Sequence, residues 1–126
     1  MPERWRPVLG YEGLYEVSDW GRVRSLDRTV ARSGSSTKRL RGRVLRQHEV
    51  GKMSYKAVNL SQSGRVQKCL VHVLVATAFC PGRTLFRREV DHRDRNPHHN
   101  RASNLRWVTR RENVHNSAHC APLSTT

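Results

Sequence analysis

Residues 91–113 read DHRDRNPHHNRASNLRWVTRREN, and this stretch decides the fold of the second half of the chain. Residues 90–92 predict the end of a short strand, and residues 105–108 alternate as a return strand. Thr109 followed by Glu112 is a capping box, in which the threonine oxygen accepts a backbone N–H and the glutamate reaches back to the cap residue. The stretch therefore predicts strand, loop, strand and helix in that order, a ββα unit.

The polar residues of this stretch have the chemistry for phosphodiester hydrolysis. Asp91 supplies a carboxylate and Asn113 an amide carbonyl, both hard oxygen donors suited to a divalent cation. His92 titrates near neutral pH and can accept a proton from water. Taken singly, Asp91 would be a loop cap and His92 a surface histidine. Together with Asn104 and Asn113 they favour a metal-dependent nuclease, because a bound cation stabilises charge on the phosphate and assists the leaving oxygen.

The charge of the chain indicates a polyanionic partner. Lys and Arg total 24 against 10 Asp and Glu, a formal net charge of +14. The basic residues are spread through the sequence, which favours nucleic acid over a merely soluble basic protein, because cationic side chains release counterions from phosphates. The sequence has no basic amphipathic helix and no apolar run of membrane-spanning length, so we expect no membrane partner.

The cysteines indicate a reducing compartment. Cys69, Cys80 and Cys120 have no CxxC spacing, and their odd number argues against a secreted disulfide scaffold. With no apolar N-terminal segment, we expect a cytoplasmic protein with reduced thiols. Cys69 and Cys80 lie among apolar residues and are expected to pack as small hydrophobic side chains.

The first half of the chain predicts short strands and a basic arm. Residues 5–26 carry apolar anchors punctuated by glycines, which is typical of several short strands. Residues 31–37 read as a flexible polar loop. Residues 38–46, KRLRGRVLR, hold five basic residues of nine and no acidic one, so we expect a basic strand or arm around Gly42.

A hairpin and a buried helix are predicted between the arm and the ββα unit. Residues 57–60 and 65–71 read as strands around a turn at 61–64. Residues 72–79 are apolar on nearly every side, which predicts a short buried helix that the following Pro-Gly pair ends.

These elements together predict an α+β fold. We expect a small N-terminal β-rich module with the basic arm at residues 1–50, here called the N-terminal module. A ββα-metal nuclease unit is expected at residues 51–117, and a tail at residues 118–126.

Two segments and four polar residues resemble known families. Asp91-His92, Asn104 and Asn113 resemble the signature of the HNH endonuclease family. VHVLVATAF (71–79) and SNLRWVT (103–109) resemble the branch found in phage and intron homing endonucleases. WRPVLGYEGLYEVSDWGRVRSL (5–26) resembles the small NUMOD4 module that often precedes such nuclease domains.

The resemblance implies a role for each residue of the signature. His92 would be the general base, and Asp91 and Asn113 would bind one divalent ion. Asn104 would brace the loop and orient His92 through a side-chain to backbone bond. Many family members carry histidine where this chain has Asn113, and asparagine disfavours zinc, so Mg²⁺ or Mn²⁺ is the implied metal.

The implied substrate is double-stranded DNA, cut by a monomer or weak dimer. One such site cuts one strand, so we expect nicking, in the host cytoplasm if the gene is phage-encoded. The basic residues expected to contact DNA are Arg22, Arg24, Lys38, Arg39, Arg41, Arg43, Arg46, Arg93, Arg106, Arg110 and Arg111. Two alternatives stay open: a non-catalytic basic DNA-binding protein, and an accessory protein of a phage packaging machine.

Other polar residues are assigned structural roles. Asn96 and Asn100 are expected to form turns and not to bind a ligand. His98 and His99 are adjacent and point apart, and no cysteine pair is near. A solvated or phosphate-touching loop is therefore favoured over a zinc site. His72, at the start of the buried helix, is expected to be structural.

Overall fold

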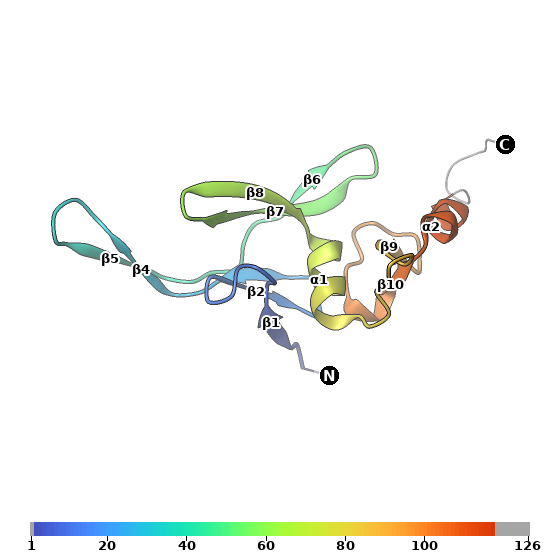
Figure 1. Ribbon diagram of the computed structural model, residues 1–126, viewed down its shortest axis with the longest axis horizontal. Helices are drawn as coiled ribbons and strands as arrows, with labels where there is room; N and C mark the ends of the chain where they lie inside the picture. The colour runs from blue at the N-terminus through green and yellow to red at the C-terminus, as the bar shows by residue number, and fades with distance from the viewer. Residues whose placement is uncertain (1, 118–126) are drawn as a thin grey trace.

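The structure is a computed structural model that describes residues 2–117 of the chain (Figure 1). Its strands in that range are β1 (Trp5–Pro7), β2 (Tyr15–Ser18), β3 (Val23–Ser25), β4 (Arg28–Ala31), β5 (Thr37–Leu40), β6 (His48–Val50), β7 (Tyr55–Gln62), β8 (Arg65–Leu70), β9 (Glu89–His92) and β10 (Leu105–Val108). Its helices are α1 (Val71–Phe79), α2 (Arg110–Ser117) and the short 3-10 helix η1 (Ala102–Asn104). The predicted tail, residues 118–126, and Cys120 lie outside the described residues.

The strands form small antiparallel sheets throughout the described part of the chain. One sheet has the order β1-β2-β3 and another the order β6-β7-β8, while β4 pairs with β5 and β9 with β10. Each strand pairs with a strand that is next to it in the sequence. The predicted α+β class, with a β-rich N-terminal part, is confirmed.

The β7–β8 hairpin turns more tightly than the sequence predicts. Ser63 and Gly64 both have positive φ, 51° and 77°, which is the requirement of the two-residue turn that matches the twist of a hairpin. The predicted turn at 61–64 is therefore too long, because the ladder continues to Gln62, which pairs with Arg65.

Helix α1 lies at the centre of the molecule, close to the predicted range of 72–79 (Figure 1). Val71, Val75 and Ala76 are fully buried on it, and the helix contacts β2, β7, β8, β9 and β10. The helix ends at Phe79, and the N–H of Cys80 closes its last turn on the Ala76 carbonyl at 2.9 Å. No helix within residues 2–117 has the length and apolar character needed to cross a membrane.

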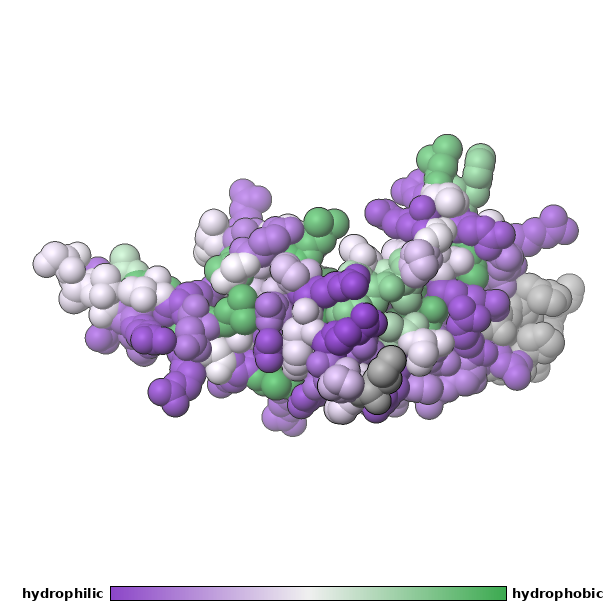
Figure 2. Space-filling model, turned by 90° about the horizontal axis from the view of Figure 1, so that it is seen from below, coloured by the Kyte–Doolittle hydropathy of each residue, from purple (hydrophilic) through white to green (hydrophobic). Residues whose placement is uncertain are grey.

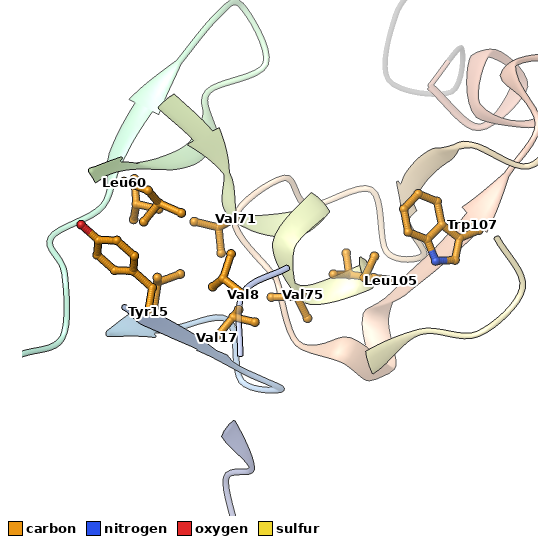
Figure 3. Close-up of a cluster of buried hydrophobic side chains, with 11 residues drawn as sticks. Val8, Tyr15, Val17, Leu60, Val71, Val75, Leu105 and Trp107 are labelled. Atoms are coloured by element: carbon orange, nitrogen blue, oxygen red, sulfur yellow. The ribbon is translucent and has the colours of Figure 1, made fainter. Parts of the chain in front are cut away.

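One hydrophobic core joins the N-terminal strands to the ββα unit (Figure 3). It includes Val8, Tyr15 and Val17, Leu60 of β7, Val71 and Val75 of α1, and Leu105 and Trp107 of β10. A hydrogen bond also connects β2 to β7, since the Tyr15 hydroxyl accepts the N–H of Ser61 at 2.9 Å. The division at residue 50 stays a prediction, and the core runs across it.

Strands β4 and β5 form a hairpin that extends away from the body (Figure 1). The predicted basic arm, residues 38–46, begins in β5 and continues into the segment at the base of this hairpin. Strand β4 was missed by the sequence prediction, which expected a loop from residue 31 to residue 37. Ala31 instead ends β4 and Thr37 begins β5. Arg24 of β3 forms an isolated bridge with Val44, which ties the base of the arm to the N-terminal sheet.

The base of the arm depends on a close backbone approach at Gly42. Its N–H donates to the Asp27 carboxylate at 2.6 Å. A Cβ atom at this position would overlap the carbonyl oxygen of Ser25 and lie 3.0 Å from the backbone of Leu26. The glycine is therefore required for space, because its φ is not among the positive values of the chain.

Gly42→Ala should lower the free energy of unfolding by about 1–3 kcal/mol, the usual cost of forcing an extra carbon into packed structure. Chemical denaturation measures the change. Gly34→Ala is the matched control, because a Cβ there meets nothing within 4 Å and the variant carries only the strain of a φ of +75°. A smaller loss for Gly42→Ala than for Gly34→Ala would contradict the packing at Ser25.

Candidate active site

The ββα unit predicted from residues 91–113 is present. Strands β9 and β10 are antiparallel, with His92 opposite Leu105 and Asp91 opposite Arg106. The capping box is confirmed: the N–H of Glu112 donates to the Thr109 hydroxyl at 3.1 Å, and the N–H of Thr109 donates to the Glu112 carboxylate at 2.8 Å. Helix α2 begins at Arg110 and packs on β9 and β10.

Asp91 and Asn113 lie on the side of the hairpin that α2 covers. The Asp91 carboxylate is 4% exposed and accepts the Nε–H of Arg106, its cross-strand partner, at 3.0 Å. The Asn113 amide nitrogen donates to Glu89 at 2.9 Å. Because alternate residues of a strand face the same side, Glu89 and Asp91 share a face. Asn113 therefore reaches the face of β9 that carries both carboxylates.

This donor set fits a hard divalent cation. Asp91 offers a carboxylate, and because the Asn113 nitrogen bonds Glu89, the Asn113 carbonyl oxygen is the atom that would coordinate an ion. Glu89 is a further carboxylate on the same face, which the sequence prediction did not name. Its position two residues before Asp91 in an extended strand is the signal that would have found it. Within residues 2–117 no cluster of three or more His, Cys, Asp or Glu side chains forms a candidate metal site.

His92 leaves β9 toward the opposite side, where it packs among aromatic rings. Its ring is 5.0 Å from that of His72 and 6.1 Å from that of Tyr55, between centroids, and the Tyr55 ring is nearly parallel to it. Its Nε2 lies 2.7 Å from the Asn100 side-chain oxygen. Since an amide oxygen only accepts, Nε2 carries the hydrogen and Nδ1 is the ring atom that can take a proton.

Burial lowers the pKa of His92 from its usual 6.5, although the Asn100 bond and the charge of Asp91 oppose the change. The ring is therefore neutral at physiological pH, which is the state that a base requires. The pKa of the neighbouring His72 falls to about 4, because burial and then the charge of His92 disfavour its protonated form. Among the described residues, Nδ1 of His72 is the buried side-chain atom without a hydrogen-bond partner.

The loop between β9 and β10 is organised around Asp94 and Asn104. The Asn104 side chain accepts the N–H of Asp94 at 3.2 Å and donates to the carbonyl of His99 at 2.8 Å. The hydrogen bond from His99 is the main cause that lowers the pKa of Asp94 to about 2, helped by the backbone N–H of Asn96. Asn104 thus braces the two ends of the loop, and the N–H of Arg93 also closes on its carbonyl at 2.7 Å.

The other loop residues divide between predicted and unpredicted roles. Asn96 forms a turn as expected, because its side chain accepts the N–H of His98 at 3.0 Å. Asn100 was expected to form a turn, but the structure has no turn at this residue. Its side chain is 5% exposed and bonds His92. Sequence reasoning missed this contact because it depends on the path of the whole loop. His72 is buried, as predicted.

Several arginines predicted to contact DNA are paired with carboxylates. Arg22 bonds Glu3 and Arg24 bonds Glu16, and both guanidinium groups lie over the ring of Trp5. The other ion-paired members are Arg39 with Asp27, Arg106 with Asp91, and Arg110 with Glu89. The remaining predicted contacts are exposed: Lys38, Arg41, Arg43, Arg46, Arg93 and Arg111.

A basic groove of about 810 Å³ runs between the N-terminal module and the ββα loop. Its arginines are Arg4, Arg93, Arg101 and Arg106. Arg4 and Arg101 are absent from the predicted set, because nothing in the local sequence links them to the other two. Trp20, 39% exposed, also lines the groove, and Arg101 lies over its ring. Arg106 therefore links the wall of the groove to Asp91, the candidate metal ligand, through the bond at 3.0 Å.

Comparisons with known proteins match both parts of the chain. The NUMOD4 motif matches residues 3–61, and the HNH endonuclease model matches residues 69–115. DNA endonuclease I-HmuI of Bacillus phage SP01 is 38% identical over 114 residues, which cover 89% of this chain and 56% of that protein. The chain therefore spans a little over half the length of this relative.

A solved structure is similar over nearly the whole chain. It describes DNA binding and cleavage by the HNH homing endonuclease I-HmuI, and its TM-score to this chain is 0.74 at 35% identity. The match covers 97% of this chain and 62% of that one. The likeness therefore includes both the N-terminal sheets and the ββα unit.

Proposed function

We propose that this chain, which belongs to the HNH endonuclease family and carries a NUMOD4 motif, is a metal-dependent endonuclease that hydrolyses phosphodiester bonds in double-stranded DNA. The observation that carries the proposal is the ββα unit, in which a buried Asp91-His92 pair ends β9 and Asn113 of α2 reaches the same strand. The similarity to a phage DNA endonuclease supports it.

His92 is the proposed general base. A water molecule gives a proton to Nδ1 of the neutral ring, and its oxygen forms a bond to phosphorus while the bond from phosphorus to a deoxyribose oxygen breaks. The bond from Nε2 to Asn100 fixes the ring during this transfer. Asn104 keeps the loop that carries Asn100 in one conformation, which fits the proposed brace.

Asp91 and the Asn113 carbonyl are the proposed ligands of one divalent ion. When bound, Mg²⁺ or Mn²⁺ supplies charge stabilisation at the phosphate and at the leaving oxygen. Arg106 holds the Asp91 carboxylate and Glu89 holds the Asn113 amide, so both ligands have fixed orientations. The oxygen donors favour these ions over zinc.

DNA is proposed to lie along the basic groove and to reach the β4–β5 arm. Arg93 and Arg106 line the groove next to the candidate site, and exposed Lys38 and Arg41 lie on the arm. Figure 2 shows hydrophilic residues along most of the length of one face. Such contacts bind phosphates and position the duplex without reading its sequence. A monomer or weak dimer with one site per chain would nick one strand.

The proposal predicts nicking of supercoiled plasmid that depends on a divalent metal. Full-length protein should convert the plasmid to open circles with Mg²⁺ or Mn²⁺, and a chelator should stop the reaction. Binding of a labelled duplex, measured in the same buffers, separates loss of cleavage from loss of binding. Metal-independent binding with no cleavage under either ion would instead favour a non-catalytic DNA-binding protein.

Neutralising the arm should weaken DNA binding by a similar factor for every sequence. The double variant Lys38→Gln, Arg41→Gln removes two phosphate contacts, so the slope of log Kd against log salt should fall by about two. Fluorescence anisotropy at several salt concentrations measures both effects. The double variant Arg65→Gln, Lys68→Gln, on the exposed strand β8, removes the same two charges and is the charge-matched control. An unchanged slope in the double variant would place DNA elsewhere.

A further inference from the structure

We infer that Asn100 is a positioning residue for His92, and that the Asp19–Gly21 turn of the N-terminal module holds Asn100 in place. The inference rests on the proposed function and deepens it. The N-terminal module would complete the catalytic centre in addition to contacting DNA.

The contact between Asn100 and His92 is buried and short. The two side chains are 5% and 6% exposed, and the Asn100 oxygen lies 2.7 Å from Nε2 of the ring. Packing against Tyr55 and His72 restricts the tilt of the ring, but those contacts do not distinguish its two edges. The amide oxygen does, because it requires a hydrogen on Nε2 and so fixes which edge of the ring faces Asn100.

The backbone of Asn100 rests directly on Gly21. A Cβ atom at Gly21 would lie 2.9 Å from the Asn100 carbonyl oxygen and 3.0 Å from its Cβ. Real Cβ atoms avoid such approaches, so the loop reaches this position because residue 21 has no side chain. Two further contacts fasten the same seam: the N–H of Ala102 donates to the Asp19 carbonyl at 2.9 Å, and Arg101 lies over the ring of Trp20, 4.8 Å from its centroid.

The turn that supports Asn100 is itself rigid. The buried Ser18 hydroxyl accepts the N–H groups of Trp20 and Arg22, at 3.2 and 3.0 Å. The Gly21 carbonyl accepts the Gln47 amide at 2.8 Å. The Asp19 carboxylate accepts the backbone N–H of Arg4 at 2.9 Å, which connects the turn to the residue just before β1. A displacement of this turn would therefore be transmitted to the imidazole through Asn100.

The first test replaces the amide by an apolar side chain with the same number and branching of heavy atoms. Asn100→Leu removes the acceptor and should lower kcat for plasmid nicking roughly 10- to 100-fold, with KM for DNA within about twofold of wild type, because the base is misplaced while the DNA contacts remain. Asn100→Asp keeps an acceptor oxygen and should lie closer to wild type. Asn96→Leu is the matched control, since that amide bonds its own exposed loop.

The second test acts from the N-terminal module. Gly21→Ala should lower kcat about tenfold through the displacement of Asn100. Gly13→Ala is the control that separates this effect from backbone strain. The φ of Gly13, +81°, is close to the +94° of Gly21, but a Cβ atom at Gly13 would meet nothing within 4 Å. Gly13→Ala should therefore leave kcat unchanged.

A spectroscopic measurement reports on the ring independently of cleavage. Nitrogen-15 NMR of the His92 ring should show the Nε2–H tautomer in wild type and a mixture in Asn100→Leu and Gly21→Ala. If wild type nicks and both variants keep its kcat, the inference is overturned. If wild type does not nick with either metal, the proposed function fails. The NMR result then tests the inference by itself: an unchanged His92 tautomer in both variants would overturn it. Should Asn100→Leu not fold, the comparison of Gly21→Ala with Gly13→Ala carries the test.

Discussion

Replacing His92 with alanine should reduce the rate of plasmid nicking by roughly two to four orders of magnitude, the usual contribution of a general base. The side chain is the buried imidazole at the end of β9, held at Nε2 by Asn100. Its loss removes the acceptor for the proton of the attacking water. His92 is buried and is not among the basic residues proposed to contact DNA, so Kd for a duplex should change little. Single-turnover nicking with saturating protein measures the chemical step.

Two controls separate chemistry from folding. His92→Ala empties space beside Tyr55 and His72, so circular dichroism and thermal unfolding must show that the variant is folded. His48→Ala removes an imidazole from β6 and should nick at the wild-type rate. Equal cleavage by wild type and a folded His92→Ala protein would reject the assignment of the base.

Acid should destabilise the protein through His72, by about 3 kcal/mol between pH 6.5 and pH 4. The pKa of the folded-state imidazole falls from 6.5 to about 4, with burial as the main cause, and each pH unit corresponds to about 1.4 kcal/mol. Between these values the unfolded chain binds a proton at His72 that the folded chain excludes. The contribution of the neutral His72 side chain to the free energy of unfolding is therefore complete above pH 6.5, and it is lost as the pH falls toward 4.

Urea denaturation at a series of pH values measures this loss. His72→Phe and His72→Gln cannot titrate, so both should show a flatter curve of stability against pH than wild type. They differ in packing against Tyr55 and His92, which changes their absolute stabilities but not the expected flattening. The remaining slope in both variants includes His92, whose pKa is lowered in the same direction. Parallel curves for wild type and both variants would show that His72 does not titrate in this window.

Local patterns were enough to predict the ββα unit. Apolar alternation predicted β10, a threonine and a glutamate at capping spacing predicted the start of α2, and an apolar run predicted α1. Each of these signals depends on residues within a few positions of one another. The same locality made the Asp91-His92 pair recognisable as the end of a strand.

Contacts between distant segments were not predictable from one sequence. Asn100 was assigned to a turn because asparagine is common in turns, whereas its role depends on how the loop folds back onto β9 and Gly21. Glu89 acquires its role from a helix 24 residues further along the chain. Strand β4 was missed because its pairing with β5 buries little apolar surface and leaves no strong alternation.

Charge counting also has a physical limit at the surface. Arg22 and Arg24 were expected to face phosphate, but Glu3 and Glu16 already hold their guanidinium groups over Trp5. A carboxylate competes with phosphate for the same fork of N–H donors. The sequence shows the excess of positive charge, and the structure shows which part of it is already neutralised.

The single core shared by β2, β7, α1 and β10 restricts how genes of this kind can recombine. An exchange that brought in only the first 50 residues from another gene would have to match the apolar surface of α1, where Val8 and Val17 pack beside Val75. Crossovers that keep both sides of that surface together would preserve folding. The segments that carry the two motifs are therefore expected to fold, and to be exchanged, as one unit.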